Sequence, residues 1–144
     1  MAITFHPAPG TILFCDFSTG FKEPEMIKRR PVVVVSKSTQ GRGDLVTILP
    51  LSTAVPEPVR DFHYLVPKRS LPMIGDFQKS DSWVKGDMIC TVGFHRLDMV
   101  ALGRVEGKRT YYKQRLGREQ MSEIYQCMLH GVGFGNLCKY INEV

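Results

Sequence analysis

Residues 28–54 have the sequence KRRPVVVVSKSTQGRGDLVTILPLSTA, in which two aliphatic runs lie on either side of a polar connector that contains glycine. The first run covers residues 32–35 and the second covers residues 45–51. Four consecutive valines are typical of a strand that is buried on both faces. The connector is typical of a longer hairpin loop, so the stretch predicts an antiparallel pair of strands.

The outer ends of this strand pair carry polar residues. Arg30 enters the first strand just before Pro31, and Ser52 and Thr53 follow the second strand directly. Because the start of one antiparallel strand lies beside the end of the next, the guanidinium and the two hydroxyls should lie close together. Such a group of donors is suited to bind an anion. The same residues also have a purely structural interpretation, since proline is tolerated at a strand start and Ser-Thr is ordinary turn sequence.

Size and composition predict a single globular domain. The chain has 144 residues, of which 43% are hydrophobic and 23% charged, and these values are ordinary for a soluble protein. No apolar run approaches the ~20 residues of a membrane span, and we expect no secretory signal. The four cysteines form no CxxC pair and have no histidine at zinc-like spacing. We therefore expect reduced, mostly buried thiols in a cytoplasmic protein without a metal or other cofactor.

The net charge of +5 favours an anionic partner. Basic residues gather in two windows, residues 22–42 and 104–118. Either window alone is most simply a solvated surface. Two such windows on a small β-rich domain make nucleic acid a serious candidate partner.

The rest of the chain predicts further strands and one helix. Residues 11–17, 61–66, 83–92 and 109–116 are expected to form strands, whereas residues 94–104 are expected to form a helical turn or a loop. The segments between them include two long loops, residues 18–30 and 67–82. Met121, Ile124, Tyr125 and Met128 form an apolar stripe at helical spacing, which predicts a helix from near Gly117 to about residue 131.

The segment 83–92 also contains candidate site residues. Gly86 interrupts it, which indicates a bulge or a close approach of another backbone segment. Lys85 and Asp87 flank this glycine at i and i+2, so they would share one face of a strand. They are either a surface ion pair or a site pair, in which the cation binds phosphate and the carboxylate moves a proton. We interpret His63, a lone strand histidine, as a structural or surface residue.

Four segments, in this order, resemble the MazF/PemK/Kid family of toxin endoribonucleases from bacterial toxin–antitoxin pairs. They are PGTILFCDF, EMIKRRPVVVVS, ILPLST and VKGDMICTV. The resemblance covers roughly residues 9–99 and implies a mainly β fold with a C-terminal α-helix, an SH3-like small β-barrel of the MazF/PemK/CcdB type. Residues 1–144 would form one domain, with the barrel at about 9–116, the helix at about 118–130 and a tail at 131–144.

The resemblance also implies a function. Family members cleave single-stranded RNA, often mRNA, at short sequences without a metal, usually as homodimers that a cognate antitoxin binds. Carried over by position, Arg30, Ser52 (with Thr53), Lys85 and Asp87 would be catalytic. Asp87 or Glu25 would be the base. The expected substrate-binding residues are Glu25, Arg29, Lys28 and Asp16.

Two departures from the family pattern leave other functions open. Serine stands for threonine at position 52, which keeps the hydroxyl, and lysine stands for arginine at position 85, which loses the bidentate fork. A non-catalytic nucleic-acid-binding domain is therefore one alternative. A CcdB-like DNA gyrase poison, which acts by protein contact, is another, although it would not need Arg30 beside Ser52.

Overall fold

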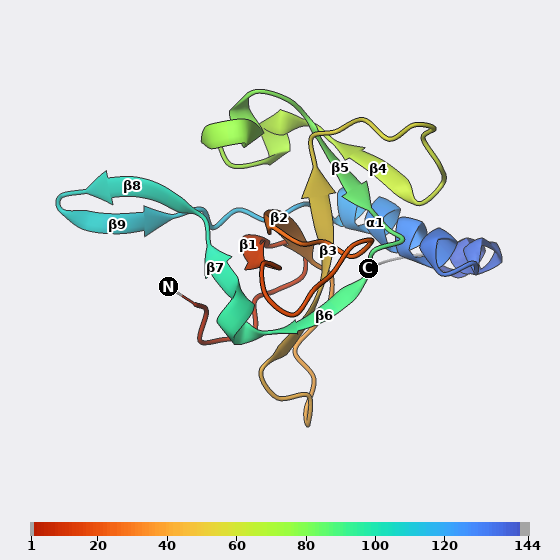
Figure 1. Ribbon diagram of the computed structural model, residues 1–144, viewed down its shortest axis with the longest axis horizontal. Coiled ribbons are helices and arrows are strands. Elements are labelled where there is room, and N and C mark those ends of the chain that lie inside the picture. Colours follow the sequence, from red (N-terminus) through yellow and green to blue (C-terminus); the bar gives the residue numbers. More distant parts are fainter. Residues whose placement is uncertain (1, 142–144) are drawn as a thin grey trace.

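The computed structural model describes residues 2–141 and confirms a mainly β fold with one C-terminal helix (Figure 1). The predicted strand pair is present as β2 (Arg29–Val34) and β3 (Leu45–Ser52), which pair antiparallel with Val33 opposite Leu49. The other strands are β1 (Ile12–Asp16), β4 (His63–Val66), β5 (Ser82–Lys85), β6 (Cys90–Gly93), β7 (Leu97–Met99), β8 (Ala101–Val105) and β9 (Lys108–Tyr111).

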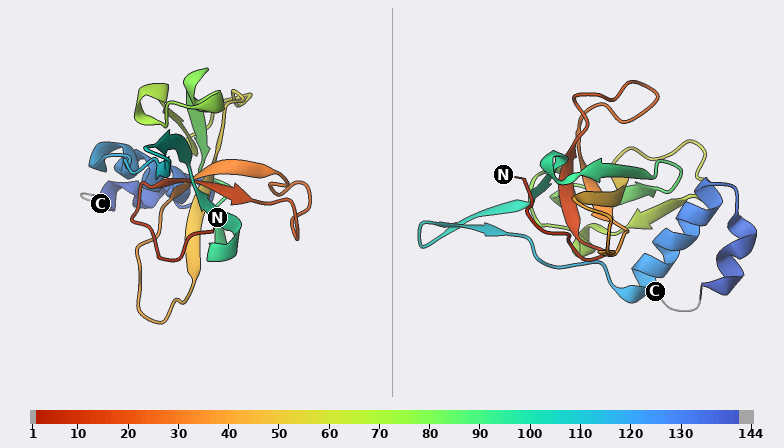
Figure 2. Two further views of the ribbon diagram at one scale, coloured as in Figure 1. Left: turned by 90° about the vertical axis from the view of Figure 1, so that its left-hand side faces the viewer. Right: turned by 90° about the horizontal axis from the view of Figure 1, so that it is seen from below.

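The main sheet has the order β4-β5-β3-β2-β1-β7, and all its pairs are antiparallel. β3 is the longest strand and has two partners on one side. Its first half pairs with β6, and its last residues, Leu51 and Ser52, pair with β5. The sheet therefore bends along β3, so that β4 and β5 leave the plane of the other strands (Figures 1 and 2).

The valine run of β2 is buried on both faces, as its sequence predicts. Val33 and Val35 belong to one core cluster, and Val32 and Val34 belong to a second cluster on the opposite face of the sheet. Full burial of each such side chain contributes about 1.5–3 kcal/mol. β2 therefore packs against both core clusters. This packing keeps the start of the strand, where Arg30 lies, in a fixed position.

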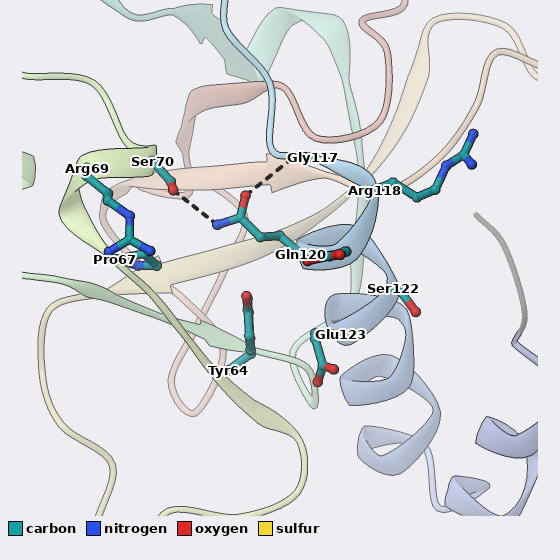
Figure 3. Close-up of a pocket in the computed structure, with 10 residues that line it drawn as sticks. Tyr64, Pro67, Arg69, Ser70, Gly117, Arg118, Gln120, Ser122 and Glu123 are labelled. Carbon is teal, nitrogen blue, oxygen red and sulfur yellow. Dashed lines mark hydrogen bonds between the residues drawn. The ribbon is translucent and has the colours of Figure 1, made fainter.

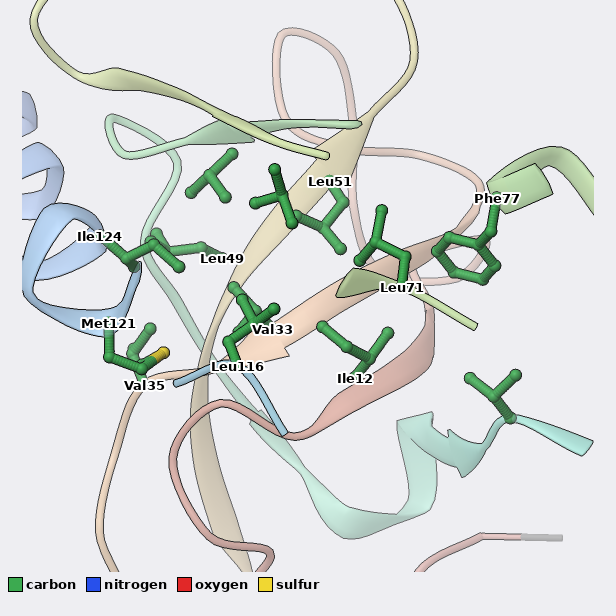
Figure 4. Close-up of a cluster of buried hydrophobic side chains, with 13 residues drawn as sticks. Ile12, Val33, Val35, Leu49, Leu51, Leu71, Phe77, Leu116, Met121 and Ile124 are labelled. Atoms are coloured by element: carbon green, nitrogen blue, oxygen red, sulfur yellow. The ribbon is translucent and has the colours of Figure 1, made fainter. Parts of the chain in front are cut away.

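The helix α1 (Arg118–Gly131) forms where the apolar stripe predicts it. Met121 and Ile124 point from the helix into the cluster that contains Leu49 and Val35 (Figure 4). The Tyr125 hydroxyl donates a hydrogen bond of 2.6 Å to the Val35 carbonyl oxygen. The helix therefore closes the open side of the sheet next to the end of β2.

Residues 83–92 do not form the single strand that the sequence predicts. Val84 pairs with Leu51 and Cys90 pairs with Ile48. The step from Val84 to Cys90 is six residues, whereas the matching step on β3 is three. Three residues are looped out, and the segment divides into β5 and β6 around a turn at Gly86 and Asp87. The expectation that Lys85 and Asp87 share a strand face is therefore wrong, because Asp87 lies in the turn.

Other predicted segments are shorter or more structured than expected. Residues 94–104 divide into a 3-10 turn (Phe94–Arg96), β7 and β8. Of the strand expected at 109–116, only its start belongs to β9, which pairs with β8 in a hairpin that projects from the body (Figures 1 and 2). The loop 67–82 contains 3-10 helices at Lys68–Ser70 and Gly75–Gln78, and the tail contains one at Gly135–Tyr140. The end of the predicted tail, residues 142–144, lies outside the described residues.

Within residues 2–141, no helix has the length and apolar character needed to cross a membrane. Over the same residues, no group of three or more His, Cys, Asp and Glu side chains is arranged to hold a metal ion.

Candidate functional site

Arg30 and the two hydroxyl residues come together at one end of the β2–β3 pair. Val32 lies opposite Pro50, and the same register continued by two residues places Arg30 beside Ser52. A cavity of about 340 Å³ at this end is lined by residues that include Arg29, Arg30, Ser52 and Thr53. The structure thus brings together the side chains that the antiparallel pairing predicts to be neighbours.

The Arg30 side chain is held in an unusual state. Its Nε atom is buried and has no hydrogen-bond partner among residues 2–141. A buried donor without a partner costs about 1–3 kcal/mol, and more when the group is charged. Arg30 lies opposite Cys15 of β1, a fully buried residue, so the apolar wall of the sheet holds the start of the arginine side chain. Because Arg30 also lines the cavity, an anion bound there would lie beside this guanidinium.

The neighbouring Arg29 is held by other contacts. Its guanidinium carbon lies 4.2 Å from the centroid of the Phe14 ring, and Nη2 lies 3.8 Å from a carboxylate oxygen of Asp98. This ion pair is partly exposed, with 52% of the Arg29 side chain accessible, so it contributes little to stability. Arg29 remains at the rim of the cavity, where it can contact a ligand.

Asp16 and Lys28, two predicted substrate-binding residues, line neither this cavity nor the one described next. Asp16 accepts a hydrogen bond of 2.8 Å from the Ser18 N–H. Hydrogen bonds from Ser18, through its side chain and its backbone, hold the pKa of Asp16 below its usual range. The contacts of Asp16 therefore organise the turn after β1. Lys28 is exposed just before β2.

Two carboxylates share a second cavity, of about 450 Å³. Glu25, from the loop before β2, and Asp87, from the turn after β5, line it together with the apolar side chains of Phe17, Phe21 and Met88. Pro50 lines this cavity and Ser52 lines the first; at i and i+2 on β3 they extend from the same face, so the two cavities adjoin along the strand. The structure therefore places both candidate bases together, close to the Arg30–Ser52 pair.

Lys85 lies at the end of β5, opposite His63 of β4. The His63 Nδ1 atom accepts a hydrogen bond of 3.0 Å from the Arg60 N–H. The pKa of His63 is lowered, mainly by partial burial and further by the charges of Lys85 and Arg60. The Asp87 carboxylate opposes this shift but does not outweigh it. His63 thus belongs to this cluster. The sequence did not single out His63, because the alternation in residues 61–66 predicts which face of the strand carries it but not which strand lies beside it.

The last turn of α1 supports the turn that carries Asp87. Gly86 fits so closely that an added Cβ would lie 2.5 Å from the Cys127 carbonyl oxygen and 2.7 Å from that of Phe62. An added Cβ on Gly131 would lie 2.6 Å from the Gly86 carbonyl carbon and 2.8 Å from the Asp87 Cα. The helix therefore determines where the Asp87 carboxylate can lie.

A larger cavity, of about 950 Å³, lies at the start of α1 and contains none of the predicted site residues (Figure 3). Its lining mixes Arg69 and Arg118 with Glu119 and Glu123. Gln120 crosses it, donating a hydrogen bond of 3.1 Å to the Ser70 hydroxyl and accepting one of 3.3 Å from the Gly117 N–H. The two positive and two negative side chains cancel, so the size of this cavity alone does not mark it as an anion site.

The fold and the site define a small barrel-like domain with an arginine–hydroxyl cluster at the end of its central strand pair. The chain belongs to the PemK-like, MazF-like toxin family of type II toxin–antitoxin systems, whose model matches residues 8–130. A putative uncharacterized protein of Escherichia coli (strain K12), YifN, is 29% identical over 149 residues, which cover 92% of this chain and 95% of that protein.

Solved structures agree on the fold. MazF from Deinococcus radiodurans has a TM-score of 0.60 at 15% identity, covering 90% of this chain and 99% of that chain. An endoribonuclease in complex with its cognate antitoxin, from a mycobacterial species, has a TM-score of 0.56 at 18% identity, covering 88% of this chain and 95% of that chain. These similarities confirm the SH3-like barrel of the MazF type. The roles of the individual site residues stay predictions.

Proposed function

We propose that this chain is the toxin of a toxin–antitoxin pair and cleaves single-stranded RNA, with mRNA in the cytoplasm as its substrate. The observation that carries the proposal is the buried, unpartnered Nε of Arg30 at a cavity that Ser52 and Thr53 also line. A guanidinium beside two hydroxyls complements a phosphate diester, because its positive charge and hydrogen-bond donors meet the negative charge and acceptor oxygens of the phosphate.

The proposed reaction is attack of a ribose 2′-OH on the adjacent phosphorus. The new O2′–P bond forms as the P–O5′ bond breaks, and the products are a 2′,3′-cyclic phosphate and a 5′-hydroxyl. Arg30 holds the phosphate and stabilises the charge that develops on its oxygens, and Ser52 or Thr53 donates a hydrogen bond to one of them. The 5′-oxygen takes up one proton as it leaves.

The second cavity supplies the base. The proton of the 2′-OH passes to the carboxylate of Asp87 or Glu25, which line this cavity together. Lys85 adds positive charge beside Asp87, from the end of β5. Serine at position 52 provides the same type of donor as threonine, and lysine at position 85 provides charge, so the two departures from the family pattern preserve these functions.

Two partners are part of the proposal. The family consists of toxins of type II toxin–antitoxin systems, and one structural relative was solved in complex with its cognate antitoxin. We propose that this chain also binds a cognate antitoxin and, as the family resemblance implies, forms a homodimer.

The experiment that tests the proposal is incubation of the purified protein with a long single-stranded RNA in EDTA. Discrete fragments with 5′-OH ends, detected by direct labelling with polynucleotide kinase, are expected. Arg30→Ala should reduce the cleavage rate by at least ~100-fold, the loss expected for one oxyanion-type donor. Arg69→Ala is the matched control, because Arg69 lines the larger cavity at the start of α1 and not the one that contains Arg30.

Two results would overturn the proposal in different ways. Near-normal cleavage by a folded Arg30→Ala protein would remove Arg30 from the mechanism. Intact RNA after incubation with folded wild-type protein would indicate a non-catalytic nucleic-acid-binding domain, if the RNA is bound, or a protein-directed toxin, if it is not.

A further inference from the structure

The face of β4 and β5 that lies opposite Val84 and the core carries Trp83, the single tryptophan of the chain. Trp83 pairs with Ser52 of β3 on one side and with Leu65 of β4 on the other. Directly opposed residues in an antiparallel sheet extend from the same face. Leu65, Trp83 and Ser52 therefore form one row across the sheet, and the β2–β3 register continues this row to Arg30.

Trp83 lies outside the two main hydrophobic clusters and is half-buried. The aromatic pairs and cation–π contacts found within residues 2–141 do not involve its indole ring. Its neighbour Leu65 is 40% exposed. A large, partly exposed aromatic side chain thus lies on this face of the sheet without an aromatic or cation–π contact within residues 2–141.

Cations lie on both sides of this tryptophan. Lys85 follows it at i+2, which places both residues on one face of β5, and Arg30 lies at the other end of the row. Across the sheet, each strand step is about 5 Å, so Trp83 is about 10 Å from Arg30. Aromatic rings between phosphate-binding cations are the pattern by which proteins hold single-stranded nucleic acid, because the bases stack while the cations bind the backbone.

We propose that Trp83 stacks on the nucleobase next to the phosphate held by Arg30 and Ser52, and that Lys85 binds a neighbouring phosphate. The open face of β4 and β5 is then the surface that positions RNA for cleavage. This inference rests on the proposed function, because it takes the Arg30–Ser52 cluster as the phosphate site. Every base presents a π-face, so Trp83 contributes affinity and position more than sequence choice.

A single tryptophan makes the inference directly measurable. A 2′-O-methyl oligoribonucleotide of mixed sequence lacks the attacking hydroxyl and is not cleaved, and it is titrated into the wild-type protein while tryptophan emission is recorded. We expect saturable quenching at the concentrations at which a labelled copy of the RNA shows binding by fluorescence anisotropy. Trp83→Leu should weaken binding by roughly 5- to 150-fold, the range for one stacked base.

Two variants separate stacking from general packing. Trp83→Phe keeps an aromatic face and should retain most of the affinity. Phe5→Leu is the matched control, because Phe5 is an aromatic residue with 55% exposure in the N-terminal segment, outside this row, and it should bind RNA as the wild type does. Circular dichroism and thermal unfolding establish that each variant is folded.

The outcomes distinguish this inference from the proposed function. RNA binding without a change in Trp83 emission, and with Trp83→Leu binding like the wild type, would overturn the stacking role even if cleavage occurs. Quenching with the expected loss in Trp83→Leu, but no cleavage of unmodified RNA, would support the stacking role and overturn the nuclease. Absence of RNA binding by the folded wild-type protein would overturn both.

Discussion

Replacing Gly131, the last residue of α1, by alanine tests how the helix supports the site. Helix propensity alone predicts that Gly131→Ala stabilises the protein by up to about 1 kcal/mol. The structure predicts the opposite sign. The new Cβ would lie 2.6 Å from the Gly86 carbonyl carbon and 2.8 Å from the Asp87 Cα, and it would also meet the Gly86 oxygen. All of these are backbone atoms, which no change of side-chain rotamer can move.

The size of the effect follows from the displacement that is needed. Restoring 3.0 Å to the Gly86 carbonyl carbon requires a movement of 0.4 Å (3.0 − 2.6), and the nearer Gly86 oxygen requires a larger one; forced overpacking of this kind costs typically about 1–3 kcal/mol. After subtraction of a propensity gain of about 1 kcal/mol, the net loss is up to about 2 kcal/mol. An unfolding entropy of about 2.1 cal/mol/K per residue makes each kcal/mol worth about 3 °C for a chain of this length, so Tm should fall by up to about 7 °C.

The assay is thermal unfolding followed by circular dichroism, with RNA cleavage measured in parallel at a temperature where both proteins are folded. Because Asp87 moves with the turn, cleavage should fall by ~10-fold or more, since small misplacements of catalytic groups are costly. Gly117→Ala is a comparison variant: an added Cβ there meets no atom within 4 Å, so any fall in its Tm reports only the weaker N-cap preference of alanine. An equal or higher Tm for Gly131→Ala would refute the packing of α1 on this turn.

Three further predictions concern single groups. Arg30→Met removes a buried donor without a partner, so Tm should stay the same or rise by about 3 °C while cleavage is lost; a clear fall in Tm would contradict this. The lowered pKa of His63 means that the unfolded chain binds its proton more readily, so stability falls as pH drops below about 6.5. His63→Asn should flatten the pH dependence of Tm in that range, whereas an equal shift at every pH would oppose this assignment. Burial raises the pKa of Cys15 and of Cys127 to about 12, so neither thiol should react with a disulfide reagent at about pH 8 until the protein unfolds.

The strand pair, the helix and the closeness of Arg30 to Ser52 could be predicted from sequence because each depends on neighbours in the chain. The two runs in residues 32–35 and 45–51 are joined by a connector of nine residues, too short for a crossover, so antiparallel pairing is the arrangement open to them. The apolar stripe from Met121 to Met128 follows the period of an α-helix and does not fit the alternation of a strand, so it predicts a helix. In these places local pattern and tertiary packing agree.

The division of residues 83–92 could not be predicted in the same way. Its periodicity fits one strand, and the three looped-out residues exist because β5 and β6 pair with different parts of β3. The close fit of Gly86 against α1 joins segments about 40 residues apart, and a glycine in sequence does not say what lies next to it. The same holds for His63, whose neighbours Lys85 and Asp87 come from the far side of a long loop.

The sequence by itself thus determined the type and place of the main elements and the arginine–hydroxyl pair, because hydrophobic period and short connections act over a few residues. Only the tertiary structure decided that Asp87 lies in a turn beside Glu25, that Arg30 keeps a buried donor unpaired, and that Trp83 faces outward in line with Ser52. These depend on which distant segments share a surface, and the packing of the whole barrel and its helix selects that arrangement.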